Sequence, residues 1–278
     1  MADTLLAAAD LLKVNDASIR DMEITAILND APMLAQLAAV TASKGTSHQY
    51  VKETTAPTVG FRAINDGRDL SSSEDTVVSV DLKLLDATFQ IDVGLANNYR
   101  LGPEAYLARE ARRHLRAAFF AAEQAFFNGD AAAGFDGLAD SLDLSYETVV
   151  DAGGTTAATA ASVYAVRTLP DESETALILG NEGQIEMLES SIVKASGATT
   201  GSYAAYYTPI LGWLGLQIGT KYSVGRVANL TEDSGKGLTD ALLAKLLEKL
   251  HAGRPPTHVV MNRRSLRQLQ SSRPTDSP

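Results

Sequence analysis

One segment of the chain, residues 103–128, carries a long and regular helical pattern. Its hydrophobic residues recur every three or four positions, at Leu107, Ala111, Leu115, Phe119, Ala122 and Phe126. Pro103 occupies a favourable first-turn position, and Asn128-Gly129 is a typical C-terminal stop. The pattern predicts a helix about 39 Å long at about 1.5 Å per residue, which we expect to be the spine of the fold.

Residues 76–93 follow the two-residue alternation typical of a β-strand. Val78, Val80, Leu82 and Leu84 share one parity, whereas Leu85, Ala87, Phe89, Ile91 and Val93 share the other. Because successive side chains of a strand point to opposite faces, the change at Leu84-Leu85 predicts a bulge or a transfer to another packing surface. We expect one long ribbon here.

Residues 45–73 have few hydrophobic anchors and many Gly, Ser, Thr, Pro and Asp residues. Such a composition buries little surface, so we expect an exposed arm or hairpin that projects from the body. Within it, Asn65-Asp66-Gly67-Arg68-Asp69 looks like a calcium loop but lacks the ligand spacing and the distal glutamate. A tight turn at the tip of the arm explains this motif better.

The remainder of the chain predicts helices at both ends and a sheet between them. The first forty residues have helical spacing, with a start at Ser18 and an interruption at Pro32. Short strands are expected at 162–168, 175–179, 206–210, 214–218 and 222–230, and an antiparallel sheet is the simplest arrangement. Thr239 is expected to cap a helix over 240–250, followed by a buried strand at 258–261 and a helix over 262–270.

The composition describes a folded, acidic protein. The 278 residues include 24 Lys and Arg against 34 Asp and Glu, which gives a net charge of −10 and argues against general nucleic-acid binding. The absence of cysteine excludes disulfides and thiolate catalysis. The N-terminal apolar stretch has no preceding basic region and is interrupted by Asp3 and Asp10, so we expect no secretion signal and a cytoplasmic origin.

The sequence offers no recognisable active site, and we predict no catalytic residue, no metal and no cofactor. The four histidines, His48, His114, His251 and His258, are too widely spaced for a zinc motif. Hydrolase and phosphate-loop motifs are absent as well. The glycines of residues 179–184 suit either a phosphate-binding loop or a hairpin turn, and the hairpin turn is favoured.

Two groups of charged residues are candidate intersubunit contacts. Four arginines lie on successive turns of the 103–128 helix, opposite its apolar face: Arg109, Arg112, Arg113 and Arg116. One interpretation is a solvated face paired locally with Glu104 and Glu110, and the other is a surface that receives an acidic partner. The arm supplies candidates for that partner in Asp66, Asp69, Glu74 and Asp75. If the arm extends away from its own helix, a neighbouring subunit's arm could reach these arginines.

A further basic group, Arg263, Arg264 and Arg267, is expected to form surface salt bridges rather than to touch nucleic acid.

Six short motifs, in this order along the chain, carry a resemblance to a known family. They are Gly60-Phe61-Arg62 with Asn65, Tyr164-Ala165-Val166-Arg167-Thr168 with Pro170-Asp171, Leu177-Ile178-Leu179-Gly180-Asn181, Gly212-Trp213-Leu214-Gly215-Leu216 before Lys221-Tyr222-Ser223-Val224-Gly225-Arg226, Leu238-Thr239-Asp240-Ala241-Leu242, and Met261-Asn262-Arg263-Arg264-Ser265-Leu266-Arg267-Gln268-Leu269. In the residues of these motifs and in the order of its elements, the chain resembles the major capsid proteins of tailed bacteriophages, which have the HK-ninety-seven-type shell fold. The resemblance covers nearly the whole chain.

The resemblance implies an α+β fold in four parts. Residues 1–44 would be an N-terminal arm, residues 45–95 an extended β-hairpin loop, residues 96–235 a peripheral domain with the spine helix and an inserted β region, and residues 236–278 part of an α/β axial domain. Relatives usually continue into further strands beyond the last helix, so we expect the closing strands of this domain to be missing or replaced. The lysine, asparagine and acid of intersubunit isopeptide crosslinking cannot be matched here.

The resemblance also implies a function. The chain would be a structural protein, not an enzyme, that self-assembles into hexamers and pentamers of an icosahedral virion capsid enclosing double-stranded DNA, assembled in the host bacterial cytoplasm. Expected partners are other copies, a portal, and a scaffold, protease or decoration protein, with only weak non-specific DNA contact and no membrane. The main alternative is an encapsulin-like compartment shell; an uncharacterised α/β enzyme and a tail-tube protein are more distant ones.

Overall fold

A computed structural model describes residues 13–14, 17–18, 31–55, 57–130, 132, 134–171, 173–197 and 200–273. The chain divides into two compact units. The first contains Met1–His48, Asp81–Ser141 and Ala176–Leu216, and the second contains Gln49–Val80, Leu142–Thr175 and Gln217–Pro278. Because each unit draws on three separate stretches of chain, neither corresponds to a single continuous segment.

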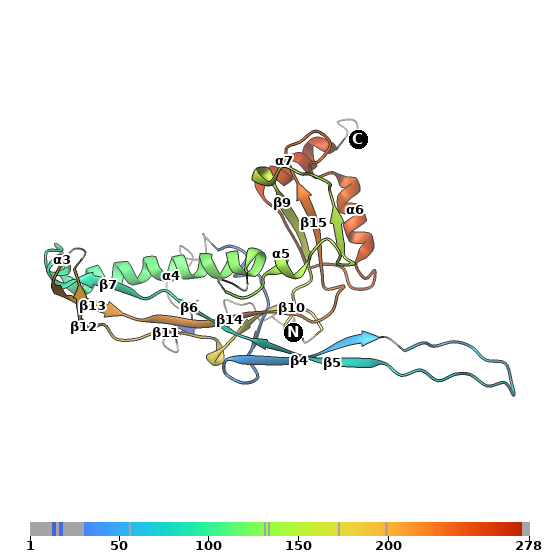
Figure 1. The fold of residues 1–278 in the computed structure, drawn as a ribbon, viewed down its shortest axis with the longest axis horizontal. Coiled ribbons are helices and arrows are strands. Elements are labelled where there is room, and N and C mark those ends of the chain that lie inside the picture. Colours follow the sequence, from blue (N-terminus) through green and yellow to red (C-terminus); the bar gives the residue numbers. More distant parts are fainter. Residues whose placement is uncertain are drawn as a thin grey trace. The chain divides into compact units, whose positions relative to one another are not determined.

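The first unit is built around α4, the helix Pro103–Asn128 (Figure 1). Its bounds are those that the hydrophobic spacing, Pro103 and Gly129 predict. The buried face includes Ala111, Leu115, Phe119, Ala122 and Phe126, which are also the positions expected to form the apolar stripe. Strands β6 (Lys83–Asp86) and β7 (Phe89–Asp92) contact α4. The short helices of this unit are α3 (Val93–Asn97) and α5 (Leu138–Ser141).

Strands of the first unit form two sheets. The larger sheet has the order β2-β1-β11-β14-β10-β3, with β6 also paired to β14. A smaller sheet has the order β12-β13-β7 and is antiparallel. The strands not yet placed are β1 (Lys13–Val14), β2 (Ala17–Ser18), β3 (Ala39–Thr41), β10 (Thr175–Leu179), β11 (Gln184–Met187), β12 (Ser191–Ser196), β13 (Ser202–Thr208) and β14 (Ile210–Ile218).

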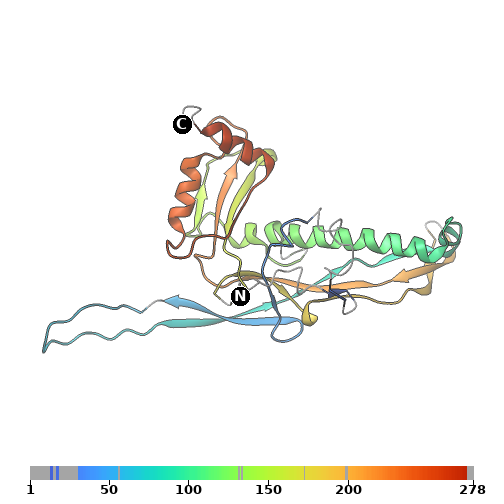
Figure 2. The same cartoon turned by 180° about the vertical axis from the view of Figure 1, so that it is seen from behind.

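The second unit contains a four-stranded sheet covered by two helices (Figure 2). The sheet has the order β16-β9-β15-β8, formed by β8 (Val149–Asp151), β9 (Ala161–Val166), β15 (Val224–Leu230) and β16 (His258–Val260). Helices α6 (Asp240–Lys249) and α7 (Arg263–Ser272) each add to its core, through Leu246 and Leu269 respectively. Thr239 caps α6 by accepting a hydrogen bond from the Leu242 amide, as predicted.

The arm is a two-stranded ribbon of β4 (Ser47–Thr55) and β5 (Glu74–Asp81), with an irregular exposed segment between the strands (Figure 1). The prediction of an exposed hairpin-like arm is therefore confirmed. Its tip contains a turn in which Asn65 has a φ of 66° and the Asp66 amide donates to the Ala63 carbonyl. The tight-turn interpretation of this motif is also confirmed.

Two sequence-based expectations about local structure are wrong. The stretch expected to be one ribbon is divided into β5, β6 and β7, which pair with β4, β14 and β13 respectively, so the transfer between packing surfaces occurs twice. Val93 begins the helix α3 instead of ending a strand. A third expectation is only partly covered by the described residues. Ser18, its predicted helix start, lies in β2, and the helix expected through Met22 and Leu28 lies outside the described residues. Residues 31–37 form turns and bends before β3, which agrees with the interruption expected at Pro32.

The expected antiparallel sheet is in fact mixed. Strands β9, β15 and β16 are antiparallel neighbours, but β15 pairs in parallel with β8. In the first unit, β10 pairs in parallel with β3, and β1 with β11. These parallel partners come from distant parts of the chain, so local turn signals do not reveal them.

Candidate interaction surfaces

The four arginines predicted as contacts lie on the exposed face of α4, but their surroundings differ. Arg109 sits over two aromatic rings, with its guanidinium carbon 5.2 Å from the ring centres of both Tyr99 and Tyr106. It also lies 3.6 Å from the carboxylate of Glu110. Cation–π contacts of this kind hold the first turns of α4 against the segment that enters it.

Arg113 forms an ion pair with Glu110 at 2.6 Å, so the local-pairing interpretation is confirmed for this residue. The Arg113 side chain remains 59% exposed. Arg112 is exposed and forms no ion pair or hydrogen bond with another described residue, while Arg116 is exposed and does have a partner within the chain. Arg112, Arg113 and Arg116 therefore present positive charge to solvent, whereas Arg109 is largely engaged by its own subunit.

An open groove lies at the C-terminal end of this arginine face. It has a volume of about 510 Å³ and is lined by Arg113, Arg116, Ala117 and Phe120. Phe120 is 53% exposed, although the adjacent Phe119 is buried. The groove therefore combines two apolar side chains with two cationic ones, a feature that the arginine spacing alone does not indicate.

The predicted acidic contacts lie in the arm. Asp66 and Asp69 belong to its irregular segment, Glu74 and Asp75 begin β5, and all four are exposed. Asp66 uses one carboxylate oxygen to accept a hydrogen bond from the Gly67 amide, while its carbonyl accepts one from Arg62. The arginine group belongs to the first unit and the acidic group to the second.

The arm also exposes large apolar side chains, which the sequence analysis did not single out. Val59, Phe61, Ile64 and Leu70 are between 85% and 108% exposed. The signal was present in the sequence as isolated hydrophobic residues in an otherwise polar stretch. Apolar groups exposed together in this way mark interaction surfaces.

Internal hydrogen bonds hold the two sides of the arm together. Arg68 donates to the Gly60 carbonyl at 2.8 Å and to the Thr58 carbonyl at 2.5 Å. The Ser71 hydroxyl accepts from the Thr58 amide at 2.7 Å. The irregular part of the arm is thus pre-organised before any partner binds it.

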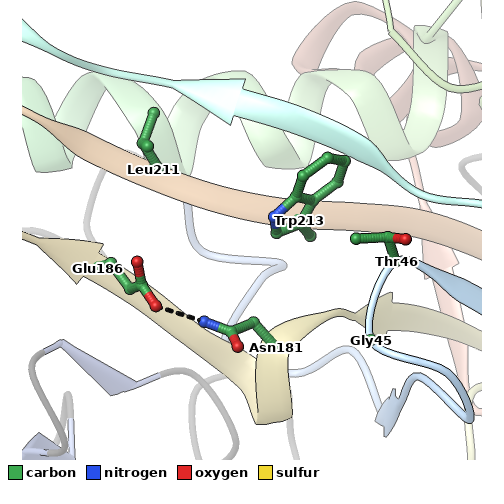
Figure 3. A pocket seen from close by; sticks show the side chains of 6 residues that line it. All are labelled: Gly45, Thr46, Asn181, Glu186, Leu211 and Trp213. Atoms are coloured by element: carbon green, nitrogen blue, oxygen red, sulfur yellow. Dashed lines mark hydrogen bonds between the residues drawn. The ribbon is translucent and has the colours of Figure 1, made fainter.

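A second hollow, of about 250 Å³, lies in the first unit beside Trp213 (Figure 3). Trp213 and Leu211 project from β14, and the Asn181 amide donates to the Glu186 carboxylate at 2.7 Å across the opening. The turn at Asn181–Gly183 joins β10 to β11, which both pair with β14 and not with each other. The favoured hairpin interpretation of residues 179–184 is therefore wrong, although the tight turn itself is present.

A charged hollow of about 430 Å³ occurs in the second unit. Its Glu174 side chain is 3% exposed and pairs with Arg167 at 2.7 Å and with Arg254 at 3.5 Å. Burial raises the pKa of Glu174, and the two arginines oppose this effect. Each charged group of this cluster pairs with an opposite charge within the same unit. We therefore interpret the cluster as an ion-pair network that stabilises the fold.

The remaining charged and titratable residues do not assemble a reaction centre. Among the described residues, no group of three or more His, Asp or Glu is placed to hold a metal ion. His114 packs against Phe89 with ring centres 4.9 Å apart, and His48 is buried. No helix in the described part of the chain is long and apolar enough to cross a membrane.

The salt bridges expected for the arginines of α7 are not formed with any described residue. Arg264 instead donates hydrogen bonds to the carbonyls of Thr159 and Leu230, at 2.5 and 3.4 Å. Arg263 and Arg267 are exposed. This expectation is therefore wrong for the part of the chain that the structure describes.

Comparison with known proteins identifies one family over most of the chain. The profile of the family described as Major capsid protein GP7 matches residues 16–272. A search of curated proteins found no significant match. The family match includes α4, the arm and both helices of the second unit.

Solved capsid structures are similar to the chain at low sequence identity. The structure of bacteriophage Epsilon15 matches with 14% identity and a TM-score of 0.52, covering 84% of this chain and 75% of that one. The bacteriophage JBD30 capsid matches with 12% identity and a TM-score of 0.44, over 81% and 77% of the two chains. The capsid of the native GTA particle matches with 12% identity and a TM-score of 0.43, covering 82% of this chain and 92% of that one.

Two of these findings, the Epsilon15 comparison and the family match, bear on the fold and on the role. The Epsilon15 comparison supports the fold, and the family match over residues 16–272 supports the role. Neither supports the alternative of an encapsulin-like compartment. The chain therefore belongs to the major capsid protein GP7 family, whose members are structural proteins of tailed-phage capsids.

Proposed function

We propose that this protein builds its shell by laying the arm of one subunit over α4 of a neighbouring subunit. The observation that carries the proposal is the arm itself, a hydrogen-bonded ribbon whose irregular segment exposes four large apolar side chains to solvent. Exposed ribbons invite association, and a protein that functions in a shell can use this property.

Charge complementarity supports the choice of α4 as the partner surface. Residues 57–75 contain four acidic side chains, Asp66, Asp69, Glu74 and Asp75, against the two arginines Arg62 and Arg68. Arg68 is occupied within the arm. Arg112, Arg113 and Arg116 provide the opposite charge, and Arg113, which is 59% exposed although its partner Glu110 is only 16% exposed, keeps a solvent-facing guanidinium that can meet a second carboxylate.

Contacts of this kind join different surfaces of identical subunits, so repeating them closes rings. We infer that such rings are the hexamers and pentamers of an icosahedral head around double-stranded DNA, assembled in the host bacterial cytoplasm. Portal, scaffold, protease or decoration proteins would be further partners, and packaged DNA would contact the acidic shell only weakly. The protein would act without catalysis.

The same proposal assigns the parts of the chain. Residues 1–44 serve as the N-terminal arm and 45–95 as the extended loop that crosses to the neighbour. Residues 96–141 and 176–216 would supply the peripheral domain with α4 as its spine, whereas β8, β9 and β15, which share a sheet with β16, would join residues 236–278 in the axial domain.

Charge reversal tests the arm-on-helix contact. The double variant R113E/R116E should fold normally but fail to form particles, because its helix face would repel the acidic arm. Assembly is measured by sedimentation and electron microscopy, and folding by thermal unfolding of the subunit. Adding D66R/D69R should restore particles.

The matched control is R263E/R267E, which makes the same change in net charge on exposed residues of α7. It should leave assembly of empty particles intact. Normal particles from R113E/R116E would refute the contact, as would a failure of the arm reversals to compensate if R263E/R267E assembles.

A further inference from the structure

Phe120 lies one helical turn beyond the last arginine of the charged face of α4. It follows Arg113 and Arg116 by seven and four positions, so the three side chains lie on one side of the helix. Phe119 and Phe126 are buried in the same helix, whereas Phe120 is 53% exposed and lines the groove. A half-exposed phenylalanine in a groove that it shares with two cationic side chains is suited to receive another apolar group.

Phe61 is the most exposed large apolar side chain of the arm, at 108%. It lies one residue from Gly60, whose carbonyl is fixed by Arg68, so the backbone that presents it is held in place. Asp66 and Asp69 lie in the same segment of the arm. One stretch of chain thus offers an aromatic group and carboxylates together.

We propose that Phe61 of one copy inserts into the α4 groove of a second copy and packs against Phe120, while Asp66 and Asp69 face Arg113 and Arg116 at its rim. The inference rests on the proposed arm-on-helix contact and gives it an apolar anchor. Buried aromatic groups dominate the energetics of protein interfaces, whereas charges at the rim mainly set register and rate.

An apolar anchor flanked by ion pairs explains why the arm and the groove each combine an aromatic side chain with charged ones. A purely acidic arm would bind α4 in several registers, since the arginines repeat along the helix. A phenylalanine that fits one groove selects a single register. Because Arg113 and Arg116 both precede Phe120 on the helix, the arm could match them in only one orientation along α4.

Truncation of the anchor gives the first test. Phe61→Ala should raise the subunit concentration needed for assembly by at least about tenfold, and Phe61→Leu should raise it much less. Subunit unfolding should be unchanged in both, because the side chain has no contacts to lose in its own chain. Equal assembly by Phe61→Ala and wild type would overturn the proposal.

Disulfide crosslinking locates the contact, and the natural absence of cysteine makes it specific. Subunits carrying Phe61→Cys are mixed with subunits carrying Phe120→Cys, assembled under reducing conditions and then oxidised. We expect disulfide-linked dimers in the mixture and none when either variant is oxidised alone. The link must join two copies, because neither chain carries both cysteines.

Ala108→Cys provides the matched control, since Ala108 is exposed on the same helix three turns before Phe120. Crosslinking of Phe61→Cys to Ala108→Cys in place of Phe120→Cys would overturn the anchor but retain the arm-on-helix contact. Crosslinking to neither position in assembled particles would overturn both. The two proposals therefore fail in distinguishable ways.

Discussion

The carboxylate of Glu123, in α4, accepts a hydrogen bond from the backbone amide of Leu34 at 3.0 Å. The same oxygen accepts a second bond from Met33 at 2.8 Å. Leu34 is 1% exposed, so this single side chain satisfies the amides of a buried turn that lies 89 positions away in the sequence. Glu123 thereby fixes the segment before β3 to α4.

Replacing this acceptor should destabilise the subunit. Glu123→Ala leaves two amides without a partner, which should lower the free energy of unfolding by about 1–3 kcal/mol. Chemical denaturation of the unassembled subunit measures the change. Glu123→Gln keeps an acceptor oxygen and should lose less, and Gln124→Ala, at the neighbouring exposed position, should have no measurable effect.

The same residue predicts a dependence of stability on pH. Burial raises the pKa of Glu123 above its ordinary value, and the two backbone hydrogen bonds partly offset the rise. The folded state therefore binds this proton more tightly than the unfolded state, so the contribution of Glu123 to stability falls as pH rises through the window above its ordinary pKa. Glu123→Gln should remove this slope; an unchanged slope would contradict the assignment.

Gly180 is expected to tolerate no side chain. A Cβ there would lie 2.6 Å from the Cβ of Trp213 and 2.7 Å from the Gly45 carbonyl oxygen. Gly180→Ala should therefore cost roughly 1–3 kcal/mol through overpacking, measured by thermal or chemical unfolding. Gly67→Ala, in the arm, is the control, because no atom lies within 4 Å of the position that its Cβ would take. Equal stability of the two variants would show that Gly180 is not packed closely against Trp213.

The buried pair of Arg167 and Glu174 gives a prediction for the second unit. Arg167→Met removes the partner 2.7 Å from a carboxylate that is 3% exposed, which should cost about 3–5 kcal/mol at neutral pH. Adding Glu174→Gln should recover much of that loss, because it removes a buried charge that only the more distant and half-exposed Arg254 would then compensate. A double-mutant cycle on subunit unfolding measures the coupling.

The loss in Arg167→Met should also shrink on acidification. Without this arginine the pKa of Glu174 rises further, so the carboxyl group takes up a proton at higher pH and the buried charge disappears. A loss that is constant with pH would contradict this account. Arg273→Met, which removes a pair with Asp240 that is exposed on both sides, should change stability by less than about 1 kcal/mol.

The sequence predicted those elements whose signals are local. Proline at the start and glycine at the end bounded α4 correctly, and Thr239 capped α6 as its position indicated. The arm was predicted from its lack of anchors. Elements that depend on distant partners were missed: parallel pairing of β8 with β15, or of β3 with β10, leaves no trace in the short segments themselves.

The candidate surfaces show the same division. The spacing of the four arginines from Arg109 to Arg116 correctly placed them on one helical face. The cation–π contact of Arg109, however, depends on where the fold places Tyr99 before α4. Equally, only the folded helix distinguishes the exposed Phe120 from the buried Phe119. Sequence periodicity identifies a face, whereas the surroundings of each side chain require the tertiary structure.

Removal of the arm should separate folding from assembly. Deleting residues 60–75 should leave a soluble subunit with a near-normal unfolding transition, because this exposed segment contributes little to either core. The deletion variant should form no closed shells in electron micrographs. A second variant, with residues 60–73 replaced by a Gly/Ser linker of equal length, should fail equally; closed shells from it would mean that the arm's side chains are dispensable.

The most direct test of the central claim is negative-stain electron microscopy of the purified wild-type protein, combined with its mass by light scattering. Our account predicts closed polyhedral particles, or rings of five and six subunits, formed by this chain alone. A monodisperse monomer under the same conditions would contradict the claim that the arm and α4 of neighbouring subunits suffice to build the shell.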